Sequence, residues 1–68
     1  MSVRAEVVAS GDELLHGAAL DTNSKYIAAE LEAAGVRVAR FTVLGDEPEE
    51  MKLGLAEACG RSDVVVWP

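Results

Sequence analysis

Two adjacent carboxylates, Asp12 and Glu13, follow a short apolar run that ends at Ala9. The residues that join them to this run, Ser10 and Gly11, add a hydroxyl and a position that tolerates unusual backbone angles. Carboxylates placed in this way could hold a divalent metal, accept hydrogen bonds from ligand hydroxyls, or act as a general base. A polar turn with solvated acids is the more common use of such residues, so the spacing alone leaves both explanations open.

Two further groups of polar residues could face the same point. Asp21 and Asn23 precede a segment of helical periodicity, so they could lie with free N–H groups at a helix N-terminus, where anions bind. Gly45 and Asp46 follow a second apolar segment, and they could lie beside Asp12 and Glu13 on one side of the same ligand site. Simple helix capping explains the first pair, and a strand-to-helix turn explains the second.

The remaining reactive residue types carry less information. His16 follows two leucines, where a structural or exposed histidine is more common than a catalytic one. Cys59 is predicted to pack on a helix face and to be inert. The sequence contains neither the GxxxxGK[ST] nor the GxGxxG pattern of phosphate-binding loops.

The elements that must position these residues alternate along the chain. Apolar runs predict strands at 3–9, 36–44 and 63–67. Apolar spacing of i, i+4 and i+7 predicts helices over residues 22–34, followed by Gly35 at C′, and from Pro48 to an end at Gly60. Helical crossovers between buried strands imply an α/β fold with a parallel sheet and right-handed connections. In such sheets, ligands bind outside the carboxyl ends of the strands.

The strands differ in polarity. The first contains the continuous apolar run Val7-Val8-Ala9 and the third the run Val64 to Trp67, so both are predicted to be central. The second carries Arg37, Arg40 and Thr42 among its apolar residues, which is typical of an edge strand.

Length and charge set outer limits on function. A chain of 68 residues forms at most one small domain, which is marginally stable by itself unless it is oligomeric or part of something larger. The net charge of −6 with scattered basic residues argues against a nucleic-acid partner. No apolar segment approaches membrane-spanning length, and a single cysteine allows no internal disulfide. A cytoplasmic location is therefore expected.

The motifs taken together resemble the molybdopterin-binding-like domain at the N-terminus of competence-damage-inducible CinA proteins. The matching positions are Gly11 to Leu15, Gly17, Asp21 to Asn23, Gly35-Val36, Gly45-Asp46 and Asp63 to Val66. The resemblance implies a three-layer α/β/α sandwich with a mainly parallel sheet, in which the first and third strands are neighbours and the second lies at an edge.

The resemblance also implies a ligand site. CinA-like proteins are associated with metal-dependent ADP-ribose pyrophosphatase activity in this domain, and many carry nicotinamide-mononucleotide deamidase activity in a separate C-terminal domain. Relatives of the domain bind molybdopterin and take part in molybdenum cofactor synthesis. Asp12 and Glu13 would then be catalytic and could hold magnesium or a similar divalent metal. The ligand, a nucleotide or a pterin, would contact Ser10, Gly11, Asp21, Asn23, Gly45 and Asp46.

One departure from the family pattern limits what residues 1–68 can do. In the family, the third strand runs into a Thr/Ser-Gly-Gly-x-Gly-x-Thr loop that supplies much of the phosphate cradle, whereas here Val66 is followed by Trp67 and Pro68. The stretch therefore resembles the N-terminal, β-α-β-α-β part of the domain. We expect these 68 residues alone to be inactive and to bind nucleotide pyrophosphates weakly. The intact protein is expected to be a homo-oligomer, and a non-catalytic interaction segment remains an alternative.

Overall fold

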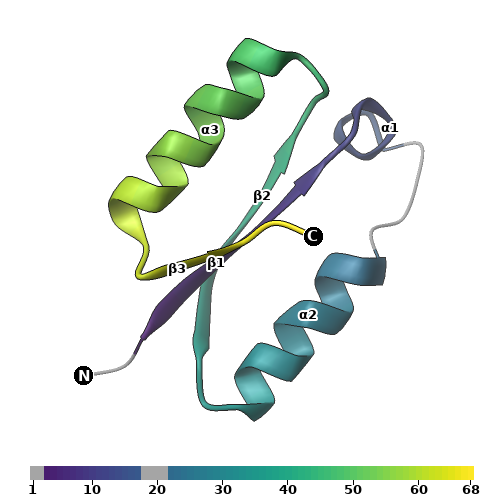
Figure 1. Cartoon of the computed structure of the whole chain (residues 1–68). Coiled ribbons are helices and arrows are strands. Elements are labelled where there is room, and N and C mark those ends of the chain that lie inside the picture. The colour runs from purple at the N-terminus through teal and green to yellow at the C-terminus, as the bar shows by residue number, and fades with distance from the viewer. Residues whose placement is uncertain (1–2, 18–21) are drawn as a thin grey trace.

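The computed structural model describes residues 3–17 and 22–68, apart from the side chain of Thr22. The elements, in chain order, are β1 (Arg4–Ser10), α1 (Asp12–Leu15), α2 (Thr22–Ala33), β2 (Arg37–Leu44), α3 (Pro48–Arg61) and β3 (Val64–Val66). The strands form one sheet between the two long helices (Figure 1). Within this described part of the chain, no helix has the length and apolarity needed to cross a membrane.

The sheet has the strand order β2-β1-β3, and both strand pairs are parallel. The central strand β1 is buried continuously from Ala5 to Ala9 because it is covered on both faces and paired on both edges. The predicted adjacency of the first and third strands and the edge position of the second are confirmed. The expectation that β3 is also central does not hold in the three-stranded sheet of the described residues, where β3 forms the other edge.

The helices lie on opposite faces of the sheet. The β1-to-β2 and β2-to-β3 connections cross the sheet in opposite directions, so two right-handed crossovers put α2 and α3 on opposite sides (Figure 1). This is the α/β/α arrangement that the family resemblance implies. It also creates a topological switch point, at the carboxyl ends of the adjacent strands β1 and β3.

A β-bulge interrupts the pairing of β1 with β2. Ala5 is opposite Val38, whereas the next residue, Glu6, is opposite Arg40, so Ala39 is an extra residue in β2. The Val38 N–H beside the bulge donates to Glu32 Oε1 of α2 at 3.4 Å. A bulge in an edge strand bends that strand and disfavours pairing with another chain.

The end of α3 differs from the prediction. The helix continues through Gly60 and ends at Arg61, so the expected end at Gly60 is wrong. The predicted packing of Cys59 is also wrong, because its side chain is exposed whereas Ala58 is fully buried. Ala58 lies seven residues after Met51, on the face of α3 that covers the sheet, and Cys59 lies about 100° further around the helix.

Candidate functional site

The candidate site begins where β1 ends. Gly11 has a φ of 141°, which an L side chain rarely adopts, and it lies immediately before α1. Its N–H donates to the Leu44 carbonyl at 2.9 Å, and its carbonyl accepts from the N–H groups of Leu14 and Leu15, both at 3.1 Å. Gly11 therefore extends the pairing of β1 with β2 and turns the chain into a short helix that the sequence analysis did not predict.

Asp12 and Asp46 join the ends of β1 and β2 by reciprocal hydrogen bonds. The Asp46 N–H donates to Asp12 Oδ1 at 2.9 Å, and the Asp12 N–H donates to Asp46 Oδ2 at 3.3 Å. Each carboxylate uses one oxygen in this pair and keeps capacity for further hydrogen bonds. Two of the predicted site residues thus meet at the carboxyl edge of the sheet, although 34 positions separate them in the sequence.

Gly45 is buried and lies against the Asp12 carboxylate. A Cβ atom added to Gly45 would lie 2.8 Å from Asp12 Oδ1 and 3.1 Å from Leu15 Cδ2, which is closer than van der Waals contact allows. The absence of a side chain at Gly45 is therefore what allows the Asp12 carboxylate to reach the Asp46 amide.

We expect Gly45→Ala to destabilise the domain by about 1–3 kcal/mol, because the added methyl group overpacks this contact. The matched control is Gly60→Ala in α3, where an added Cβ meets nothing within 4 Å. That change should stabilise the protein by up to about 1 kcal/mol through helix propensity. Urea unfolding of both variants measures the difference, and equal stabilities would contradict the packing described at Gly45.

Ser10, at the end of β1, contacts the end of the neighbouring strand. Its Oγ accepts a hydrogen bond from Trp67 Nε1 at 3.0 Å. This bond crosses the switch point between β1 and β3. The sequence analysis did not assign a role to Trp67, and an aromatic residue after an apolar run gives no indication of its partner.

The other predicted site residues are less closely tied to this group. Glu13 is exposed, and its carboxylate folds back over Gly11, since a Cβ at Gly11 would lie 2.9 Å from Glu13 Oε1. Asn23 is exposed in the first turn of α2, which points toward the same edge of the sheet (Figure 1). Asp21 lies outside the described residues.

Within residues 3–17 and 22–68, no three His, Cys, Asp or Glu side chains come together as a metal-binding group. Magnesium commonly takes only one or two protein carboxylates and completes its octahedron with water and substrate phosphates. The oxygens of Asp12 and Asp46 fit that requirement, because the reciprocal hydrogen bonds hold the two carboxylates at one place.

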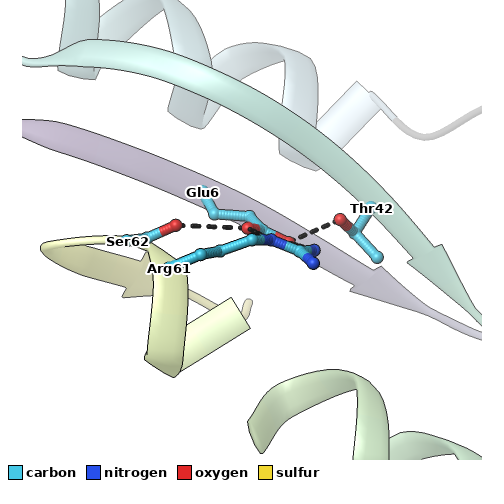
Figure 2. Close-up of polar contacts among 4 residues, drawn as sticks. All are labelled: Glu6, Thr42, Arg61 and Ser62. Carbon is cyan, nitrogen blue, oxygen red and sulfur yellow. Dashed lines mark hydrogen bonds and ion pairs between the residues drawn. The ribbon is translucent and has the colours of Figure 1, made fainter. Parts of the chain in front are cut away.

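A buried polar cluster elsewhere in the sheet was not predicted (Figure 2). Glu6, in the middle of β1, is fully buried and accepts two hydrogen bonds from the Arg61 guanidinium, from Nε at 2.9 Å and Nη2 at 2.8 Å. Thr42 Oγ1 donates to the same carboxylate at 2.6 Å and Ser62 Oγ at 3.2 Å. The cluster ties the end of α3 to β1 and β2, on the α3 face of the sheet.

The cluster keeps Glu6 ionised. The hydrogen bonds from Arg61, aided by those from Thr42 and Ser62, outweigh burial and lower the pKa of Glu6 from 4.5 to about 2. The same contacts raise the pKa of Arg61. The one sequence signal was the carboxylate inside an apolar strand, because a buried charge requires a partner.

Comparison with known proteins supports the resemblance. Residues 6–67 match the family described as "Probable molybdopterin binding domain". The chain is 44% identical over 62 residues to a CinA-like protein of Desulfosudis oleivorans and 46% identical over 65 residues to one of Chlorobium luteolum. These alignments cover 91% and 96% of this chain but only 15% of each relative.

A solved structure agrees with the fold. The crystal structure of the protein CinA with unknown function from Thermoplasma acidophilum superposes with a TM-score of 0.89 at 32% identity. It covers 97% of this chain, which corresponds to 39% of the crystallised chain. The sequence match, the identities and the shared fold together show that this chain belongs to the molybdopterin-binding-like domain family and is CinA-like.

Proposed function

We propose that the carboxyl edge of β1 and β2 binds a small nucleotide and that the domain takes part in hydrolysis of a nucleotide pyrophosphate of the ADP-ribose type. The observation that carries the proposal is the meeting of Asp12 and Asp46 at the ends of two adjacent parallel strands. Open parallel sheets bind their ligands at this edge. The resemblance to CinA-like proteins, which implies a ligand site at Gly11 to Glu13, also supports the proposal.

In the proposed reaction, water attacks one phosphorus of the pyrophosphate and the bond from that phosphorus to the bridging oxygen breaks. Asp12 and Glu13 would orient the water and accept its proton, since both carboxylates lie on α1 at the strand edge. Ser10, Gly11, Asn23, Gly45 and Asp46 would contact the ligand, and Asp21 would join them from outside the described residues.

The charge of the site bears directly on this proposal. Asp12, Glu13 and Asp46 are acidic, and the chain has twelve acidic residues against six basic ones. A phosphorylated ligand therefore needs a counter-charge at this edge. A divalent metal held by Asp12, together with Glu13 as the resemblance implies or with Asp46 as the reciprocal hydrogen bonds suggest, would supply this counter-charge. When bound, it would polarise the phosphoryl oxygens.

In the intact protein, which continues beyond these 68 residues in the CinA-like reading, we expect Asp12→Asn and Glu13→Gln each to lower the turnover of ADP-ribose with magnesium by about 100-fold or more, as loss of a general base does. Asn at position 12 keeps an oxygen that can accept from the Asp46 N–H, so the fold is preserved while the charge is lost. The control is Glu30→Gln on the exposed surface of α2. Turnover of both site variants at the level of the control would refute the assigned roles.

A second candidate function is molybdopterin binding in molybdenum cofactor synthesis, which the description of the matching family favours. The same edge would then hold a pterin without hydrolysing a pyrophosphate. Calorimetric titration with molybdopterin separates the two functions, because the hydrolase proposal requires turnover and this one requires only binding.

Three properties of the whole protein remain proposals of the same kind. The matched relatives are several times longer than this chain. A nicotinamide-mononucleotide deamidase domain is proposed for the whole protein, and this proposal rests on the family resemblance alone. A homo-oligomeric state is proposed on the same ground. The single cysteine supports a cytoplasmic location.

A further inference from the structure

We infer that Glu6 is a positioning residue for the candidate site, because its buried contacts set the pairing register of β2 that brings Asp46 opposite Asp12. The inference rests on the proposed site at the carboxyl edge of β1 and β2, but it does not rest on the proposed ligand or reaction. It gives the buried cluster of Figure 2 a function in the site as well as in stability.

The register between β1 and β2 changes once, at Glu6. In a regular ladder Ala39 would be opposite Glu6, whereas the bulge places Arg40 there. A bulge interrupts the backbone hydrogen bonds of the ladder, so the backbone alone favours the register without it. Contacts between side chains must therefore favour the bulge.

The start of β2 is held by the end of α2. The Val36 N–H donates to the Leu31 carbonyl of α2 at 2.9 Å, and the Arg37 N–H donates to the Val3 carbonyl beside it at 3.2 Å. The strand therefore cannot slide as a whole, and only the part after Val38 can adopt either register.

The choice of register decides which residue lies opposite Asp12. In the observed register Asp12 follows the ladder to a place opposite Asp46, with which it exchanges hydrogen bonds. Without the bulge, β2 would be displaced by one residue and Gly45 would be opposite Asp12. The reciprocal hydrogen bonds of the candidate site therefore need the bulged register.

Apolar side chains do not decide the register, because β2 has them on both faces. Side chains of a strand alternate between faces, so a shift by one residue exchanges the two faces. Leu44 packs on α3 in the observed register, since a Cβ added to Gly54 would lie 2.7 Å from Leu44 Cδ2. Phe41 and Val43 are 49% and 40% exposed on the other face, and the shift would turn them toward α3. One apolar side chain thus favours the observed register and two favour the alternative.

The Glu6 cluster does distinguish the registers. Thr42 Oγ1 donates to Glu6 Oε2 at 2.6 Å, and the shift would turn this hydroxyl to the opposite face of the sheet. Arg61 donates from Nε to one oxygen of the same carboxylate and from Nη2 to the other, and such paired contacts fix the orientation of both groups. Glu6 is fully buried, so losing a donor is costly. Fixing a register is the best-attested role of a buried polar group in specificity.

The test uses the Glu6→Leu/Arg61→Leu double variant, whose apolar side chains should keep the domain folded but do not distinguish the registers. The readout is amide hydrogen exchange of the full chain, measured by NMR. We expect the protection of the Asp46 amide, relative to the slowest amides of β1, to fall by about tenfold, the size of one lost hydrogen bond. Comparison with the slowest amides removes any change in global stability from the result.

Deletion of Ala39 provides a rescue. Without this residue, a regular ladder leads from Val38 directly to Arg40 opposite position 6, so the register of the site no longer needs a bulge. Deleting Ala39 from the double variant should therefore restore the protection of the Asp46 amide. A cluster that acts on stability alone predicts no such rescue.

A matched pair of variants tests the contact with β2 by itself. Thr42→Val keeps the shape of threonine without the hydroxyl, whereas Thr42→Ser keeps the hydroxyl. Thr42→Val should lower the relative protection of the Asp46 amide by about threefold or more, and Thr42→Ser should leave it unchanged. The control is Arg40→Leu, which removes an exposed arginine from the same strand.

Two results of the double variant would overturn the inference: unchanged protection of the Asp46 amide, or lost protection that deletion of Ala39 does not restore. An unprotected Asp46 amide in the unchanged chain would overturn it as well. If the double variant does not fold, the two Thr42 variants decide the question. None of these measurements involves a ligand, so absence of ADP-ribose turnover would remove the proposed function and leave this inference intact.

Discussion

Arg61→Leu is expected to destabilise the domain by about 3 kcal/mol, one of the largest effects of any single change in the described residues. The variant leaves the Glu6 carboxylate fully buried with only the Thr42 and Ser62 hydroxyls as donors. Removing one partner of a buried ion pair costs about 3–5 kcal/mol, because the remaining charge is not compensated. We place the effect at the lower end, since the Arg61 side chain is 38% exposed and part of its interaction is screened by solvent.

Glu6→Leu should destabilise the domain less than Arg61→Leu does, and the double variant should destabilise it less than either single change. In Glu6→Leu the orphaned guanidinium of Arg61 can turn to water, whereas the carboxylate in Arg61→Leu cannot. The double variant Glu6→Leu/Arg61→Leu replaces the pair by apolar groups and should recover most of the lost stability. Arg37→Leu, which removes an exposed arginine in β2, is the control. Urea unfolding of all four proteins tests this order, and an Arg61→Leu variant as stable as the control would contradict it.

Stability should also fall as the pH is lowered from about 5 to about 2. Glu6 has a pKa of about 2 in the folded protein and 4.5 as its ordinary value, so the unfolded chain binds a proton first. The stabilisation by ionised Glu6 is therefore complete above pH 4.5 and is lost as the pH falls through the folded-state pKa. The difference in pKa corresponds to about 3 kcal/mol.

Glu6→Gln isolates this contribution from the other acidic residues. Glutamine occupies nearly the same space and has no charge to titrate. It has one acceptor oxygen, so it can accept from Thr42 or from Ser62 but not from both, because their hydroxyls donate to different oxygens of Glu6. The stability difference between the two proteins, measured by urea unfolding at several pH values, should be largest near pH 7 and should shrink toward pH 2. A difference that is independent of pH would show that the charge of Glu6 does not stabilise the fold.

Much of the fold follows from local signals in the sequence. The apolar runs identify the strands to within one or two residues at most ends, and the polar edge strand is recognisable from Arg37 and Arg40. Gly35 was expected at C′ of the first helix, and the structure has it there with a φ of 87°. These features depend on neighbouring residues, which a sequence displays directly.

The parts that were missed depend on distant residues or on very short elements. α1 has four residues, which is too few for helical periodicity to be seen. The bulge at Ala39 reflects how two strands align, and the partnership of Glu6 with Arg61 joins residues 55 positions apart. Cys59 was misplaced because positions 58 and 59 both continue the apolar spacing, and only the packing of α3 on the sheet separates them. The meeting of Asp12 with Asp46 was predictable, because parallel strands bring their carboxyl ends together.

The strand order has a consequence for how the protein is made. β1 is synthesised first but occupies the centre of the sheet, and its two partners are β2 and the much later β3. Ala5 pairs with Val64, so β1 cannot complete its pairing until almost all of the 68 residues have left the ribosome. At typical synthesis rates of about 5–20 residues per second, this delay is about 3–12 s. Throughout that time the strand that is most buried in the folded domain has an open edge, which makes it a site for chaperone binding during translation.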